Sequence, residues 1–217
     1  MYDILIKNGR IIDGSGAKSK YADVGVRDGK IISIGKIDSK ASITLNAEGM
    51  VVSPGFIDLH THSDFTLVIN GRAESQVHQG VTTEVVGQCG LSCAPVRNKG
   101  GIAVNSIGYI DGVVEANWTT FSEYLDHLDS IPLGVNVAAF VGHGTLHHTI
   151  VGDELRGPND DELENMKSLL AESIEGGAYG LSSGLEYWPG NLASFDQLAE
   201  LAKIAANKDV LYATHVR

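Results

Sequence analysis

The alternation of apolar runs with helical patterns is the feature of this sequence that most restricts its fold. From Val51 onward, short runs rich in β-branched residues alternate with segments whose apolar residues recur at helical spacing. The runs are continuously apolar, as in strands that are buried on both faces of a sheet. The predicted strands span residues 51–59, 81–89, 133–143, 178–185 and 209–217, and the predicted helices span 72–80, 119–130, 159–177 and 194–208.

Strands that alternate with helices in this way form parallel sheets in α/β proteins. No glycine-rich phosphate fingerprint follows the first predicted strand, which argues against a doubly wound nucleotide-binding sheet. We therefore predict a (β/α)8 TIM barrel, of which this chain holds about five βα units. The missing strands are expected from the rest of a longer chain, because a five-stranded barrel would leave an open edge. The segment from Lys99 to Trp118 fits neither period and is predicted to pass over the barrel mouth.

The first fifty residues have a different pattern, with strand-like alternation and turns but no helical stretch. Asp28-Gly29 lies between two apolar runs, which is a hairpin signal. We predict a small N-terminal β-sandwich segment over residues 1–53 and the first part of the barrel over residues 54–217.

Charge and cysteine content restrict the location and the partners of the protein. The net charge is −11 and no Lys/Arg cluster is present, which argues against nucleic-acid binding. The only cysteines, Cys89 and Cys93, cannot build a disulfide framework and fit a reducing compartment. The N-terminus lacks the pattern of a signal peptide, and no apolar run has the ~20 residues that a membrane helix needs. We predict a cytoplasmic protein that binds neither nucleic acid nor membrane.

A pair of histidines follows the first predicted barrel strand. Side chains two residues apart on a strand point the same way, so His60 and His62 project together from its C-terminal end. Barrel enzymes build their active sites at this end, and two imidazoles at this spacing can bind one divalent ion. Asp58 and Asp64 share this parity and can act as further ligands or as partners that support the ligands.

Three other predicted strands also end in a residue that binds metals, namely Cys89, His143 and His215. Each of these alone would more often be structural, but a structural role does not explain their common position. Thiolate and neutral imidazole suit zinc best among the common metals. The strand ends therefore predict a zinc site. Cys93 lies past its strand and is expected to be structural, while His147 and His148 are expected in the next loop.

Five segments together closely resemble the N-acyl-D-amino-acid deacylases (D-aminoacylases) of the amidohydrolase superfamily. They are "PGFIDLHTHSD", "QGVTTEVVGQCGLS", "VGHGTLH", "GAYGLSSGLEYWPG" and "LYATHVR", and they cover the chain in order. The first indicates only the superfamily, whereas "GQCG" with "SGLEYWPG" indicates the deacylase branch. The resemblance implies a zinc-dependent hydrolase that cleaves the linear amide of small-molecule N-acyl-D-amino acids to a carboxylate and a free D-amino acid. It also implies a β-domain shared by both termini.

The resemblance further implies roles for individual residues. His60 and His62 match the first-strand ligands of a second, weaker metal position, while Cys89 and His215 match the ligands of one tightly bound zinc. Tyr187 matches a pocket tyrosine that contacts substrate. His143 matches a supporting histidine near the site, and Asp64 is assigned a supporting role from its parity.

The family's sixth-strand histidine and its catalytic aspartate from the eighth strand have no counterpart before Arg217. No catalytic residue is therefore identifiable, and the 217 residues alone are expected to be inactive.

Two alternatives stay open at this point. Cyclic-amide hydrolases of the hydantoinase or dihydroorotase kind resemble the same superfamily but usually bridge their metals with a carboxylated lysine on the fourth strand. No lysine lies between Ser168 and Ala202, and Cys89 offers the bridge instead. A non-catalytic amidohydrolase-like protein is the other alternative, although it would have no reason to keep ligands at four strand ends.

Overall fold

The computed structural model describes residues 1–97 and 116–216, which belong to two compact units, Met1–Gly55 and Phe56–Arg217. The predicted excursion from Lys99 to Trp118 lies almost entirely outside the described residues. Among the helices that are described, none combines the length and the apolar character needed to span a membrane.

The N-terminal unit is one mixed sheet with strand order β3-β2-β1-β4, and β5 also pairs with β1. The β2–β3 hairpin turns at Asp28 and Gly29, whose φ angles of 50° and 68° suit the tight turn predicted there. Asp23 anchors the sheet because it accepts hydrogen bonds from the Ile37 and Asn8 N–H groups, which lower the pKa of its carboxyl. The described strands form a single layer, so the second layer of the predicted sandwich stays a prediction. The strands are β1 (Tyr2–Ile11), β2 (Lys20–Arg27), β3 (Lys30–Gly35), β4 (Ala41–Asn46) and β5 (Val51–Val52).

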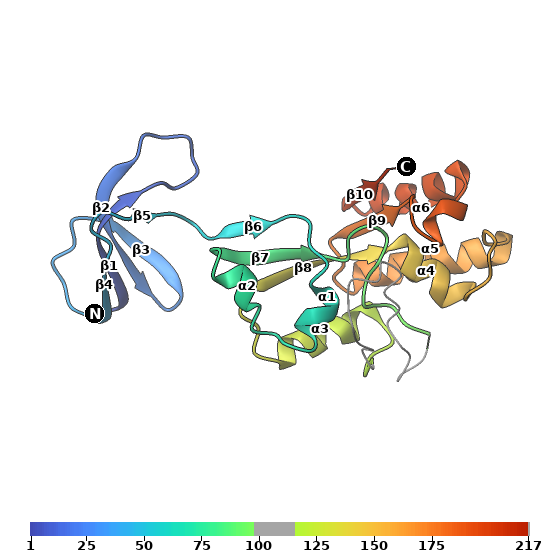
Figure 1. Ribbon diagram of the computed structural model, residues 1–217, viewed down its shortest axis with the longest axis horizontal. Helices are drawn as coiled ribbons and strands as arrows, with labels where there is room; N and C mark the ends of the chain where they lie inside the picture. Colours follow the sequence, from blue (N-terminus) through green and yellow to red (C-terminus); the bar gives the residue numbers. More distant parts are fainter. Residues whose placement is uncertain (98–115, 217) are drawn as a thin grey trace. The chain divides into compact units, whose positions relative to one another are not determined.

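In the described parts of the C-terminal unit, five parallel strands each pair with the next one along the chain. This order confirms the predicted parallel sheet, and the sheet curls as the wall of a barrel does (Figure 1). Parallel pairing places all the carboxyl ends of the strands at the same edge. The strands are β6 (Phe56–Asp58), β7 (Val81–Val86), β8 (Asn136–Gly142), β9 (Gly180–Gly184) and β10 (Leu211–His215).

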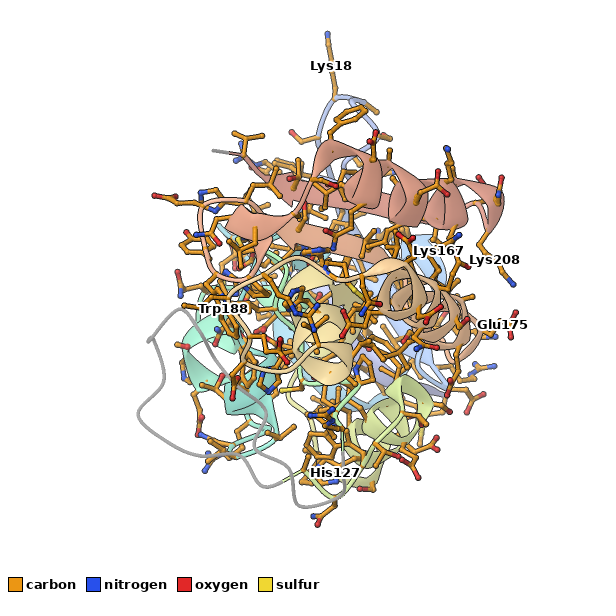
Figure 2. All side chains as sticks on the ribbon, turned by 90° about the vertical axis from the view of Figure 1, so that its right-hand side faces the viewer. Lys18, His127, Lys167, Glu175, Trp188 and Lys208 are labelled. Carbon is orange, nitrogen blue, oxygen red and sulfur yellow. The ribbon has the colours of Figure 1, made fainter. Side chains whose placement is uncertain are left out.

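Helices connect these strands and bury the outer face of the sheet. In α5, Met166 and Leu170 lie four residues apart on one face and are packed in the core with no exposed surface. Lys208, just after α6, forms an ion pair with Glu175 at the end of α5 on the outside of the unit (Figure 2). The helices are α1 (Asp64–Leu67), α2 (Glu74–Val77), α3 (Phe121–Ser130), α4 (His143–Ile150), α5 (Asp160–Glu175) and α6 (Phe195–Asn207), with a 3-10 turn η1 (Gly190–Leu192).

Two sequence-based expectations differ from the structure. The predicted strand 51–59 is two strands, β5 in the first unit and β6 in the second, because Pro54 between them has no N–H to donate to a ladder. Phe56 and Ile57 are 62% and 60% exposed rather than buried, since β6 is an edge strand. The loop expected around His147 is the helix α4, which begins directly after β8.

Candidate metal centre

The loop after β6 carries the predicted histidine pair. Burial alternates along it: Thr61 and Ser63 are buried, while His60 is exposed and His62 is half-buried. The two hydroxyl groups are hydrogen-bonded at 2.5 Å, and the Ser63 N–H also donates to Thr61 Oγ1. Asp58 accepts a hydrogen bond from the backbone N–H of His60. The loop is thereby held in a shape that leaves both imidazoles on one side, with ring centroids 5.5 Å apart.

Cys89 lies three residues beyond β7 and contacts His60 in the loop after β6 and His215 at the end of β10. Its Sγ is 3.3 Å from His60 Nε2 and 3.5 Å from His215 Nδ1. The ligand atoms of His60, His62 and Cys89 all lie within 4.8 Å of one another, close enough to share a metal ion. Residues at or after the ends of β6, β7 and β10 therefore converge at the carboxyl edge of the sheet, and their role as metal ligands stays a prediction.

His215, the last residue of β10, uses its two ring nitrogens differently. Nδ1 faces Cys89 and lies 3.3 Å from the Tyr187 hydroxyl, whereas Nε2 lies 3.2 Å from a carboxylate oxygen of Glu186. A carboxylate on one nitrogen orients the ring and leaves the other nitrogen free to bind, which is typical of metal-binding histidines. The Glu186 carboxylate thus leaves Nδ1 of His215 directed at the Cys89 sulfur.

Burial is the main influence on the ionisation of Cys89 and His62. Burial raises the pKa of the Cys89 thiol above its usual range. Burial, together with the neighbouring His60 and His215, lowers the pKa of His62. The imidazole of His62 is therefore held in the neutral form that binds metals. A cation beside Cys89 would favour the thiolate, because a coordinated thiol loses its proton.

His143 and Asp64 are buried near this region but lie outside the group of converging ligand atoms. His143 accepts a hydrogen bond from the Gln197 amide at Nε2, so its proton is on Nδ1, which has no partner among the described residues. Burial lowers the pKa of His143 to about 4. Burial also raises the pKa of Asp64 to about 8, and neither of its carboxyl oxygens has a partner in the described parts of the chain. The supporting roles of both residues stay predictions.

The chain is similar to proteins of known family and structure. A family model described as "Amidohydrolase family" matches residues 44–213. The chain belongs to the amidohydrolase family. The D-aminoacylase of Alcaligenes xylosoxydans xylosoxydans is 36% identical to this amidohydrolase over 217 residues, which is 100% of this chain and 44% of the relative.

Two solved structures extend the comparison. The crystal structure of a D-aminoacylase that defines a novel subset of amidohydrolases has a TM-score of 0.91 and 36% identity, covering 100% of this amidohydrolase and 46% of that chain. The N-acyl-D-glutamate deacylase from Bordetella bronchiseptica, solved with zinc and a phosphonate inhibitor that mimics the tetrahedral intermediate, has a TM-score of 0.90 and 37% identity, covering 100% and 45%. The resemblance to the deacylases is confirmed, and the chain spans less than half the length of these relatives.

Three residues in or around the site have no role assigned from the sequence. Glu186 lies inside the "SGLEYWPG" segment but carried no assigned role. Ser182, on β9, contacts the turn that holds Cys89. His147 was placed in a loop, yet it is 1% exposed and its Nε2 lies 2.9 Å from the Arg156 carbonyl. The alternation of side chains along β9 places Ser182 on the same face as Gly184. Nothing in the local sequence, however, indicates that Ser182 contacts the Cys89 turn.

Proposed function

We propose that the protein to which this chain belongs is a zinc-dependent hydrolase of N-acyl-D-amino acids, acting on a linear amide to release a carboxylate and a free D-amino acid. The observation that carries the proposal is the convergence of Cys89 with His60 and His215 at the carboxyl edge of the sheet. It is supported by the 36% identity to a D-aminoacylase along the whole chain.

The donor set fits zinc, which binds thiolate and imidazole with little geometric preference. Cys89 and His215 would hold the tighter zinc, and His60 and His62 a second, weaker one. The Cys89 sulfur contacts a histidine of each pair, His215 and His60. When bound, zinc supplies a Lewis acid for the amide carbonyl and lowers the pKa of water.

The residues around the ligands would orient ligands and substrate. Glu186 holds Nε2 of His215, which keeps Nδ1 directed at Cys89. The Tyr187 hydroxyl lies beside the same Nδ1 at 3.3 Å, so a substrate carbonyl bound there would meet a hydrogen-bond donor. His143 and Asp64 would support the site from the buried side.

The finer architecture is part of the proposal. Residues 54–217 would form the first part of a (β/α)8 barrel, and residues 1–53 the N-terminal part of a composite β-sandwich domain. Large apolar side chains at both edges of the curled sheet favour the barrel. Phe56 on β6 is 62% exposed and Leu211 on β10 is 64% exposed. Further strands from a longer chain would cover them and supply the remaining histidine and the catalytic aspartate. A cytoplasmic location fits the two free cysteines.

The test uses the intact protein, purified and analysed for metal. We expect bound zinc and release of D-methionine from N-acetyl-D-methionine, with N-acetyl-L-methionine as the stereochemical control. A chelator is expected to abolish the release and added zinc to restore it. Opening of a hydantoin ring without hydrolysis of N-acetyl-D-methionine would instead support a cyclic-amide hydrolase. A zinc-loaded protein that hydrolyses no N-acyl-D-amino acid contradicts the proposal.

A further inference from the structure

A serine from a distant strand holds the turn that carries Cys89. Ser182 lies on β9 and has no exposed surface. Its hydroxyl accepts a hydrogen bond of 2.9 Å from the Gly90 N–H and donates one of 2.5 Å to the Gly87 carbonyl. The two bonds attach on either side of Cys89 along the chain, so one hydroxyl spans the whole turn.

The turn has an unfavourable backbone conformation that its surroundings must maintain. Cys89 has a φ of 54°, in the left-handed region that a residue with a side chain rarely adopts. Gly87 and Gly90 on either side also have positive φ angles, of 75° and 77°. A conformation of this kind costs about 1–3 kcal/mol and persists only where neighbouring groups enforce it.

The backbones of two strands lie directly against the turn. A Cβ atom added to Gly184 on β9 would lie 2.1 Å from the Cys89 carbonyl oxygen. A Cβ added to Gly142 on β8 would lie 2.4 Å from the backbone of Gly90. The turn therefore has contacts on the strand side but depends on hydrogen bonds for its exact orientation, and Ser182 supplies two of them.

We infer that Ser182 is a positioning residue for the Cys89 sulfur, an inference that rests on the proposed zinc site. Its hydroxyl fixes the turn in the conformation that sets Sγ 3.3 Å from His60 Nε2 and 3.5 Å from His215 Nδ1. Removing the hydroxyl leaves a buried N–H and a buried carbonyl without a partner, which favours a change in the turn. Relaxation of the φ angle of Cys89 would then move the sulfur away from the histidines.

Ser183 offers a matched control on the same strand. It is also fully buried, and its hydroxyl also forms two hydrogen bonds, at 2.7 Å to the Tyr212 hydroxyl and at 2.8 Å to Thr214 Oγ1. Both partners lie on β10 rather than on the Cys89 turn. Ser183→Ala therefore removes the same group, at the same burial, from the other face of β9.

The experiment compares Ser182→Ala with Ser183→Ala in the intact protein, after thermal unfolding shows that both are folded at the assay temperature. Zinc affinity is measured by competition with a chelator, and the sulfur ligand is followed by thiolate-to-cobalt charge-transfer absorption in the cobalt-substituted protein. Ser182→Ala is expected to weaken zinc binding about ten- to a hundredfold and to weaken the absorption, while Ser183→Ala matches the wild type. Ser182→Thr keeps the hydroxyl and is expected to bind zinc as the wild type does.

A third measurement needs no metal, so it separates this inference from the proposed function. Cys89 is expected to react faster with a thiol reagent in metal-free Ser182→Ala than in the wild type or in Ser183→Ala, because the turn is released. Equal reaction rates, or equal zinc affinity and absorption in Ser182→Ala and the wild type, overturn the inference. Equal losses in both alanine variants, or in Ser182→Thr, also overturn it because they indicate a general packing role. A wild-type protein that binds no zinc overturns the proposed function, and the reaction rates alone then decide the role of Ser182.

Discussion

The Sγ of Cys89 lies 3.5 Å from Nδ1 of His215, although 126 residues separate the two along the chain. Cys89 follows β7 and His215 ends β10, and in a flat sheet these strands would be three spacings, or ~14 Å, apart. The turn that carries Cys89 lies against the backbones of Gly142 on β8 and Gly184 on β9, and Gly184 is paired with His215. The contact between the thiol and the imidazole therefore follows from the path of this turn across the carboxyl ends of the strands.

Loss of the Cys89 thiol is expected to remove the tighter zinc. Cys89→Ala should lower zinc affinity by more than about a hundredfold and abolish hydrolysis of N-acetyl-D-methionine, because it deletes the one sulfur donor in the group. Metal analysis of the purified variant checks this directly. Cys93→Ala is the control, since Cys93 is buried and lies outside the group of ligand atoms, and it should keep its zinc. Full zinc content in Cys89→Ala would contradict the assignment.

The Tyr187 hydroxyl is expected to contribute to substrate binding rather than to metal binding. Tyr187→Phe should lower kcat/KM for N-acetyl-D-methionine by up to about tenfold, as expected for the loss of one hydrogen bond, and leave the zinc content unchanged. Tyr179→Phe serves as the control because Tyr179 is 61% exposed and its hydroxyl belongs to no part of the site. The assignment fails if both variants have the kinetics of the wild type.

A methyl group at Gly184 is expected to disturb the Cys89 turn from the strand side. Its Cβ would lie 2.1 Å from the Cys89 carbonyl oxygen, so the backbone of one partner must shift. Gly184→Ala should therefore lower the free energy of unfolding by about 1–3 kcal/mol and weaken zinc binding. Among the described residues, a Cβ at Gly157 would meet just the Leu192 carbonyl oxygen, at 3.7 Å, so Gly157→Ala should change neither quantity. Chemical denaturation and chelator competition measure the two effects, and a Gly184→Ala protein that resembles Gly157→Ala would refute the prediction.

The buried imidazole of His143 is expected to make stability depend on pH. Burial lowers its pKa to about 4 from 6.5, with a smaller contribution from neighbouring His147. A depressed folded-state pKa means that the unfolded chain binds the proton more tightly, so stability is complete above pH 6.5 and declines as the pH falls toward 4. The loss amounts to about 3 kcal/mol. His143→Gln should lack this component of the decline in urea unfolding measured across that range. Parallel pH profiles for the variant and the wild type would show that His143 is not held neutral.

The strands and long helices of the C-terminal unit were predictable because each has a strong local sequence pattern. Buried parallel strands read as apolar runs, and α5 places Met166 and Leu170 on one face at helical spacing. Helix α4 was missed because its sequence, "HGTLHHTI", has few apolar residues with which to mark a face. The ring of its His147 contacts residues outside the helix, namely the Arg156 carbonyl and the Trp188 ring, which lies 41 residues after His147 in the chain and at a centroid distance of 6.4 Å. The exposure of Phe56 was equally unpredictable, since edge and central strands can have the same apolar sequence.

The sequence by itself determined which chemical groups lie at the carboxyl ends of the strands, because side-chain alternation and strand ends are local properties of the backbone. Only the tertiary structure decided which of these groups meet. The turn after β7 packs across β8 and β9, which joins Cys89 to His215 and to Ser182, whereas His143 and Asp64, which follow the same parallel pattern, are buried apart from the ligand atoms. The physical reason is that the path of this turn depends on the strand backbones against which it packs, and such contacts join segments far apart in the chain rather than belonging to any one segment.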